Sequence, residues 1–340
     1  MQASRLTIDD QRWHEFTSTH PDAGPFHLPA WTALIAECYR FQAFVLAVRD
    51  DDGELLAGVP VVVVRFPLRP QRWVSLPFSD SCPLLLRPGI AVEDVIGAFD
   101  EHRRASGCGE LELRCALPAG DGVYPVEVGY QHVVKLPQDA SDLHPHRNFR
   151  QHRNQAASKG VRVARGCARE DMEAFYRLHT LTRRRLGVPV QPHRFFALLR
   201  HRLLEPGHGF VATAALDGQV LAAAVYLVHN GTIVAKYQAS DPDRRETGAG
   251  HLMHWEVLSS GCGEGYHSYD MGRTDPDAEG LRVFKQRMGA DETPLFYTHV
   301  TSTPPSEKRA GVGSLSQRVI SGSPVWVCRA LGETLYRWTA

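Results

Sequence analysis

The chain has 340 residues, which is too long for one ordinary hydrophobic core and fits two domains of roughly 150 residues each. Its 43% hydrophobic and 22% charged residues are typical of a soluble globular protein, and no apolar run is long enough to span a membrane. The net charge is zero and indicates no partner, although residues 141–209 hold fourteen Lys or Arg against five Asp or Glu and would meet an anion first.

The seven cysteines are scattered, odd in number and without a C-x-x-C pair, so neither a disulfide framework nor a zinc site is indicated. The first residues, MQASRLTIDDQRW, have no apolar core after a basic start and do not read as a signal peptide. We therefore predict a cytoplasmic protein with reduced thiols.

Two stretches of the chain read alike, at residues 44–64 and 210–228. Each is an apolar strand, an Asp-Gly turn and a longer apolar strand, which predicts a β-hairpin. Any two hairpins look similar, but helix-like segments precede both, and Gly53 and Gly218 lie 165 positions apart. We predict two copies of one α/β domain, at 1–143 and 144–300. A tail at 301–340 follows, with an apolar stripe typical of an amphipathic helix that packs on its own core or contacts a membrane surface.

In the first predicted domain, the segment SLPFSDSCPLL places Asp80 between apolar stretches. Its carboxylate could pair with the ammonium of an amine substrate or accept its proton. The alternative is a turn in which Asp80 binds backbone amides.

The second predicted domain begins with a basic segment at 146–165 that has six Lys or Arg and no acidic residue. In a helix, Arg147, Arg150 and Arg153 would fall within one arc of about 120°. Such a face suits a phosphate-bearing ligand such as RNA, a nucleotide sugar or CoA, although a simple solvated face is the alternative. The histidines nearby lack acidic or thiol neighbours, so we predict no metal site.

Further along, RRETGAG leads into a predicted helix at 248–265. Arg245, Gly248 and Gly250 could hold a pyrophosphate through free backbone amides and the helix dipole. Glycines before a helix are common, so the motif alone is weak, but it favours a CoA donor. The order of strand, hairpin, strand, helix, strand, helix and strand is that of the GNAT-type acyltransferase fold, whose mixed central sheet splays to admit an acyl donor.

Near the end of this domain, Lys285 lies in GLRVFKQRMG, just before an aromatic-rich strand. When an amine attacks an ester or thioester, negative charge grows on the carbonyl oxygen, and a desolvated cation stabilises it. We predict that Lys285 has this catalytic role, with Phe284 and Tyr297 as apolar walls, and that Asp80 is the second catalytic residue, acting on the amine; the alternative for Lys285 is a surface position. The residues that we also assign to substrate binding, on the neighbouring predicted strands, are Tyr237, Asp270 and Arg273.

The pattern YDMGR…GLRVFKQRMGA…PLFY resembles the closing motif of the Fem-type transferases, and RNFRQHRNQAASKGVRV resembles the basic helix that leads into their second domain. The segments GPFHLPAW, SLPFSD, HLMHWEVL and SPVWVCRALGETLYR are similar to a branch of Fem-like proteins from bacterial exopolysaccharide and natural-product settings. The resemblance covers nearly the whole chain and implies two tandem GNAT-like domains.

The resemblance also implies that the chain forms an amide by moving an aminoacyl group from aminoacyl-tRNA to an amine, with no tightly bound cofactor. Lys285 would stabilise the tetrahedral intermediate, and Phe284 would position the aminoacyl end. Wall-bridge members carry a lysine shortly after the equivalent of Trp31, but WTALIAECYR has only Arg40 as a cation, so a small metabolite or glycan amine is the expected acceptor.

Two alternatives stay open: an acyl-CoA-dependent N-acyltransferase of the same fold, and a non-catalytic scaffold of polysaccharide assembly. No DNA partner is expected. The sequence identifies neither the acyl group nor the oligomeric state.

Overall fold

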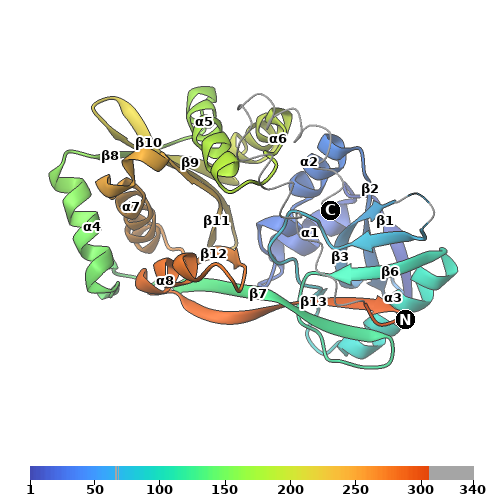
Figure 1. Cartoon of the computed structure of the whole chain (residues 1–340). Helices are drawn as coiled ribbons and strands as arrows, with labels where there is room; N and C mark the ends of the chain where they lie inside the picture. Colours follow the sequence, from blue (N-terminus) through green and yellow to red (C-terminus); the bar gives the residue numbers. More distant parts are fainter. Residues whose placement is uncertain (66, 68, 306–340) are drawn as a thin grey trace. The chain divides into compact units, whose positions relative to one another are not determined.

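The computed structural model describes residues 1–65, 67 and 69–305, which divide into two compact units (Figure 1). Unit 1 contains Met1–Tyr130 and a return segment that begins at Pro294, and unit 2 contains Gln131–Thr293. The expected boundary at 143–144 thus falls inside unit 2, and Tyr297 belongs to unit 1. The predicted helix of the tail lies outside the described residues.

The chain passes between the units inside two long strands, β7 (Val123–Lys135) and β13 (Asp291–Thr301). In unit 1, β13 pairs antiparallel with β6 (Cys108–Leu113), with Thr298 opposite Leu113. The predicted domain boundary lies in the polar segment that follows β7. This segment belongs to unit 2, where the Leu136 amide donates to the carbonyl of His267 at 2.9 Å.

Unit 1 is built on the strand order β1-β2-β3-β4-β6-β13, with β5 paired to β3. The predicted hairpin is confirmed as β2 and β3, which pair antiparallel. The pair β4–β6 is parallel, joined through a helix, α3. The bounds of the elements not yet given are β1 (Gln2–Leu6), α1 (Gln11–Thr19), α2 (Pro29–Tyr39), β2 (Gln42–Arg49), β3 (Leu55–Val64), β4 (Gln71–Val74), β5 (Leu85–Leu86) and α3 (Val92–Ala105).

Unit 2 has the strand order β7-β12-β11-β10-β9-β8. Its second predicted hairpin is also confirmed: β9 and β10 pair around Asp217 and Gly218, both at positive φ, as the tight turn requires. The elements are α4 (Arg147–Ser158), β8 (Arg162–Gly166), α5 (Arg169–Arg185), α6 (His193–Leu199), β9 (Gly209–Leu216), β10 (Gln219–His229), β11 (Thr232–Ser240), α7 (Ala249–Gly263), β12 (Ser268–Thr274) and α8 (Glu279–Arg287).

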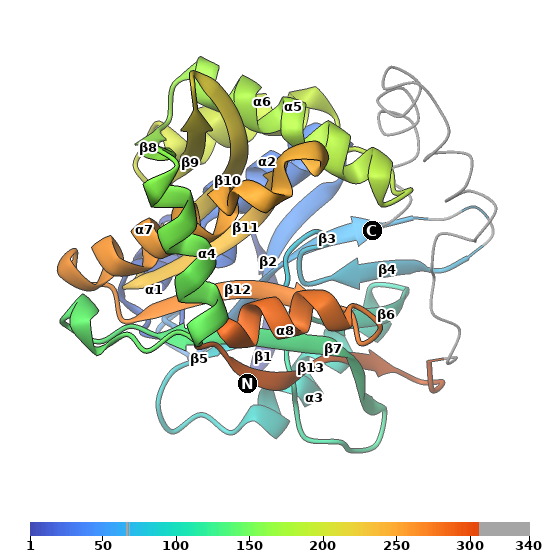
Figure 2. The same cartoon turned by 60° about the vertical axis from the view of Figure 1, so that its left-hand side comes forward.

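Helices cover both faces of the unit 2 sheet. On one face, Ala222, Ala224 and Tyr226 of β10 share a buried apolar cluster with α7 and with Phe149 of α4. Figure 2 shows α4 crossing α7 and reaching α8, which agrees with the contacts of these helices. The other helix that packs on β9, β10 and β11 is α5. The core therefore fixes the start of α7 against the sheet.

The sheet of unit 2 splays between two parallel strands. Although β11 has nine residues, it pairs with β12 only through Thr232–Val234, opposite Ser268–Asp270. Beyond that point, β11 continues along β10 as far as Ser240, and β12 turns away. The predicted splay of the central sheet is thus observed, and it leaves room beside the second half of β11.

Candidate acyl-donor site in unit 2

A cavity of about 560 Å³ occupies the space that the splay opens. Its walls come from the end of β11, the start of α7, the end of α5 and the start of α8. The residues that matter chemically among its lining are Arg185, Asp241, Arg244, Arg245, Gly250, His251, His254 and Phe284. The mouth is thus rich in guanidinium groups, and the interior holds aromatic and imidazole rings.

Three of these arginines form the charged mouth of the cavity. Arg185 ends α5, whereas Arg244 and Arg245 precede α7. Within the described part of the chain, none of their guanidinium groups forms an ion pair or a side-chain hydrogen bond. Partial burial and the charge of Arg245 lower the pKa of Arg185, which places two like charges close together. An anionic ligand would relieve that repulsion.

The two glycines of the predicted pyrophosphate motif have different surroundings. Gly248 caps α7 in the left-handed conformation, at φ 73°, and a Cβ there would lie 2.5 Å from the carbonyl oxygen of His152. It is therefore required for the contact between α4 and α7, and it is not part of the cavity wall. Gly250 has open space around it and does line the cavity, so it is the glycine that a ligand could approach.

The basic segment at 146–165 forms the helix α4 as far as Ser158 and enters the strand β8 at Arg162, and the arginines of α4 do not line the cavity. Arg147 and Arg150 are exposed. Arg153 is half-buried and stacks on Trp255, with its guanidinium 4.1 Å from the ring centroid. Arg147 and Arg150 are therefore accessible to an anionic partner, whereas Arg153 packs on Trp255.

Phe284, on α8, lines the cavity. It packs against His251, His254 and Phe149, with ring centroids 5.2, 5.9 and 6.2 Å apart. It also lines a second cavity, of about 490 Å³, between α4 and α8. Its ring thus separates two hollows on the same side of the unit.

Lys285, by contrast, is directed into the protein. The side chain is buried, at 2% exposure, and Nζ donates to the backbone carbonyls of Met271 at 2.7 Å and Gly272 at 2.9 Å, with a longer contact of 3.4 Å to that of Arg273. Three successive carbonyls converge because Gly272 has a positive φ of 68°, which interrupts the alternation of a strand. The ammonium therefore pins the end of β12, and the predicted alternative of a surface lysine is wrong.

Asp270 takes part in the same turn. Its carboxylate accepts a hydrogen bond from the Gly272 amide at 2.7 Å and another from Gln131 Nε2 at 2.8 Å. Arg273 is exposed and pairs with Asp275 at 2.6 Å. Tyr237 is buried among Phe175, Phe195 and Phe196. Asp270 and Tyr237 thus have structural contacts in unit 2 that explain their presence without a ligand.

Asp80 and Tyr297 belong to unit 1, where they lie together. The Tyr297 hydroxyl donates to the backbone carbonyl of Asp80 at 3.0 Å. The loop that carries Asp80 is firmly held, because Ser79 accepts from Trp31 Nε1 at 2.8 Å and its carbonyl accepts from Arg114 at 2.5 Å. Two residues of the same loop, Leu76 and Phe78, have positive φ, and such strain is often found where a loop must present a particular side chain.

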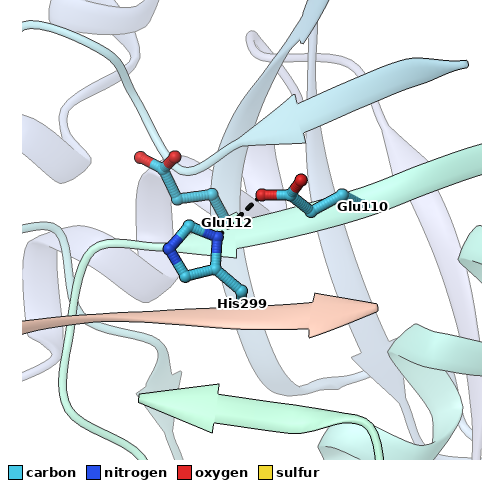
Figure 3. A group of neighbouring side chains, drawn as sticks. All are labelled: Glu110, Glu112 and His299. Carbon is cyan, nitrogen blue, oxygen red and sulfur yellow. Dashed lines mark hydrogen bonds and ion pairs between the residues drawn. The ribbon is translucent and has the colours of Figure 1, made fainter. Parts of the chain in front are cut away.

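One group of side chains in unit 1 has the composition of a metal site. Glu110 and Glu112 of β6 and His299 of β13 each offer a ligand atom, and these atoms lie within 4.8 Å of one another (Figure 3). Arg72 already contacts both carboxylates, at 3.0 and 2.9 Å, and His299 Nδ1 lies 2.7 Å from Glu110. The arginine balances the acidic charge, so the group is explained without an ion.

Sequence reasoning missed Arg185, Arg244 and His254. Arg244 is adjacent to a residue of the predicted motif, and Arg185 closes an arginine run at the end of a predicted helix, but only the fold brings α5 to the start of α7. His254 lies on the buried face of α7, beside Met253 and Leu258, where the pattern predicted only apolar packing. The signal that could have indicated it is a polar residue within an otherwise apolar helical stripe.

The comparisons with known proteins agree with this architecture. Residues 145–285 match the family described as the acetyltransferase (GNAT) domain. The crystal structure of FemX superposes with a TM-score of 0.71 at 15% identity and covers 89% of this chain and 98% of that one. No curated protein sequence matches the chain.

Two further structures share the fold. The C-terminal domain of a putative lysylphosphatidylglycerol synthetase from Agrobacterium fabrum has a TM-score of 0.57 at 12% identity, covering 91% of this chain and 94% of that one. A tandem GNAT protein from the clavulanic acid biosynthesis pathway has a TM-score of 0.54 at 12% identity, covering 90% of this chain and 99% of that one. Among the helices that the structure describes, none is both long and apolar enough to cross a membrane. The chain therefore has the tandem GNAT-like fold that these structures share, and its residues 145–285 match the acetyltransferase (GNAT) domain family.

Proposed function

We propose that the protein forms an amide by transferring an aminoacyl group from aminoacyl-tRNA to an amine, either a small metabolite or a glycan precursor. The observation that carries the proposal is the cavity of unit 2, where three arginines without acidic partners surround the mouth and aromatic rings line the interior. A phosphate-bearing donor would be held at the mouth, and its acyl end would reach Phe284.

The exposed arginines of α4 favour RNA over a smaller donor. Arg147 and Arg150 extend the positive charge beyond the cavity, onto a helix that contacts α7. A nucleic-acid backbone has many phosphates and gains from such an extended surface, whereas a single pyrophosphate needs only the mouth. The putative lysylphosphatidylglycerol synthetase domain, which shares the fold, is named for a product that carries a lysyl group, and this supports an aminoacyl donor.

An acyl-CoA donor is the second candidate, and the start of α7 favours it. Open space at Gly250 lies at the amino end of a fifteen-residue helix, where backbone amides and the helix dipole attract a pyrophosphate. Both candidates use the same cavity and the same arginines.

An aminoacyl ester is already reactive toward an amine, so the protein mainly has to position the two reactants and stabilise the charge that develops. Lys285 has a positioning role in this proposal: it fixes the end of β12 and keeps a positive charge beside Phe284. Asp80, in unit 1, stays our candidate for a residue that binds an ammonium group.

The donor is identified by incubating the protein with a panel of amines and either charged tRNA or acyl-CoA, and detecting the amide by mass. Product that disappears after ribonuclease treatment supports aminoacyl-tRNA, and release of the free CoA thiol together with product supports acyl-CoA. Absence of product with either donor would contradict an enzymatic function and favour a scaffold role.

The cavity is tested with Arg185→Gln and Arg245→Gln. Loss of one charge-assisted hydrogen bond to phosphate should raise the KM for the donor about 10- to 100-fold, with a smaller change in kcat. Arg169→Gln is the matched control: Arg169 lies on α5 as well, but it is exposed, pairs with Glu173 and is not part of the cavity wall. An equal effect of all three substitutions would show that total charge matters and that the cavity does not bind the donor.

A further inference from the structure

A buried polar group lies at the inner wall of the cavity. His254 of α7 contacts the hydroxyls of Tyr226 on β10 and Tyr269 on β12, with Nδ1 at 3.0 Å and 2.6 Å from the two oxygens. The hydroxyls are 3.3 Å from each other. Tyr226 and Tyr269 are completely buried, and His254 is 2% exposed. Burying three polar side chains in an apolar core is unfavourable unless their hydrogen bonds are formed, so their presence there suggests a function.

The contacts determine which part of the imidazole faces the cavity. Since both hydroxyls meet Nδ1, the nitrogen left for another partner is Nε2. His254 lines the cavity next to Phe284, and within the described part of the chain no hydrogen bond to its Nε2 is formed. An imidazole nitrogen at the wall of a cavity can form a hydrogen bond with a ligand or a water there.

His254 is neutral at physiological pH. Burial, together with the charges of His251 on α7 and Lys285 on α8, lowers its pKa to about 3. The other titratable groups packed against it are the two tyrosines, and burial raises the pKa of each well above its ordinary value. No carboxylate contributes to the shift. A neutral imidazole is a weak base, but it can donate a hydrogen bond to a carbonyl without giving up its proton.

The same wall lacks the donor that the sequence led us to expect there. The ammonium of Lys285 is turned toward the carbonyls of β12 and is not part of the cavity wall. His254, on α7, does line the cavity, and its buried ring is held by the two tyrosine hydroxyls. Rigid, desolvated donors aimed at a developing negative charge are the most effective kind.

We propose that Nε2–H of His254 donates to the carbonyl oxygen of the acyl group that is transferred, an inference that rests on the proposed function. Tyr269 donates its hydroxyl proton to Tyr226, and in the proposal Tyr226 in turn donates to Nδ1, which places the ring proton on Nε2. The amine lone pair forms the new C–N bond while the carbonyl π electrons move to the oxygen, where His254 stabilises them. Collapse breaks the bond to the ester oxygen or thiolate, and the surplus proton of the nitrogen passes to that leaving group. His254 keeps its proton throughout.

Two substitutions of His254 distinguish the role of Nε2 from that of Nδ1. In His254→Gln the side-chain amide reaches the position of Nε2, whereas in His254→Asn it reaches only that of Nδ1. We expect His254→Asn to lower kcat on the order of 10²- to 10³-fold with little change in the KM for the donor, and His254→Gln to stay within about 10-fold of the wild type. Equal losses in both variants, at equal thermal stability, would overturn the proposal.

The pH profile distinguishes a neutral donor from a general base. For a neutral donor, kcat/KM between pH 6 and 8 should have the same shape in the wild type and in His254→Gln. An acidic limb that is present in the wild type and lost in His254→Gln would show that His254 accepts a proton, which contradicts the proposal.

A measurement without turnover keeps this inference separate from the proposed function. The Nε2 resonance of His254, in protein labelled with 15N-histidine, is followed while an amide-linked analogue of 3′-aminoacyl-adenosine or a ketone analogue of acetyl-CoA is added. A shift of the Nε2 signal with either probe supports the contact, even if no amine is acylated and the proposed reaction fails. An unchanged signal with both probes overturns the inference, even if amide product forms.

Discussion

Replacing Lys285 by Met tests whether its ammonium holds the fold or contacts the substrate. The substitution removes the donors that serve the carbonyls of Met271 and Gly272, at 2.7 and 2.9 Å. A hydrogen bond that involves a charged group contributes about 1.5–3 kcal/mol, so the two bonds together contribute about 3–6 kcal/mol. The buried ammonium also loses hydration, which offsets part of this contribution. We expect the free energy of unfolding to fall by about 3 kcal/mol.

Thermal unfolding measures this change directly. In a domain of 150–250 residues, each 1 kcal/mol lowers the Tm by about 2–4 °C, so the Lys285→Met variant should unfold about 6–12 °C below the wild type. Lys135→Met is the matched control in the same unit, because the Lys135 side chain is 89% exposed and lies 3.9 Å from Asp291. Exposed substitutions of this kind usually change stability by less than about 0.5 kcal/mol.

The outcome separates two roles for one side chain. A Lys285→Met protein that keeps the wild-type Tm but forms no amide would refute the structural role and restore direct contact with the reacting oxygen. A protein that loses stability, and loses turnover only in proportion to its unfolded fraction, would show that Lys285 acts through the shape of β12.

Three other predictions concern the two glycines, acid stability and RNA. Gly248→Ala should destabilise the protein by more than about 1 kcal/mol, because residue 248 has a positive φ and the new Cβ would lie 2.5 Å from a carbonyl oxygen. Gly250→Ala should leave the midpoint of urea unfolding unchanged or higher, because nothing lies near the new Cβ, but it should weaken donor binding. Burial lowers the pKa of His179 to about 3, so below pH 6.5 the unfolded state binds a proton that the folded state does not. Stability should fall by about 2 kcal/mol per such histidine between pH 6.5 and 5, and urea titrations of His179→Gln should show a smaller decrease. Replacing both Arg147 and Arg150 by Gln should reduce the salt dependence of tRNA binding by about two phosphate contacts, and an unchanged slope would remove α4 from the RNA surface.

The elements that the sequence predicted correctly are local. Each hairpin is specified by an Asp-Gly turn between apolar runs, and α7 by the glycines that precede it, because turn geometry depends on a few adjacent residues. The basic helix α4 was equally clear, since its two buried residues, Phe149 and Ala156, lie seven positions apart.

The domain boundary and the direction of the Lys285 side chain could not be predicted in this way. β13 carries the pattern of an ordinary strand, and nothing in that pattern says that Thr298 pairs with Leu113, 185 positions earlier. Lys285 was expected to face a cavity because it follows Phe284, but its ammonium is captured by carbonyls that a single positive φ at Gly272 brings together. Arg185 was missed for a similar reason, since it ends α5 and only the fold brings it to the segment that carries Arg244 and Arg245.

The loss of strand pairing after Val234 and Asp270 explains why the site lies where it does. Up to that pair, β11 and β12 are held together, and Tyr269, the last residue but one, is fixed beneath His254. Immediately afterwards the Asp270 carboxylate and the Gly272 backbone turn β12 away, and Lys285 holds the turned strand. The opening of the cavity, the capture of the ammonium and the placement of the imidazole therefore follow from one change of direction in the backbone. A substitution that straightens this turn, such as Gly272→Ala, should impair all three together, whereas His254→Asn should affect only the reaction.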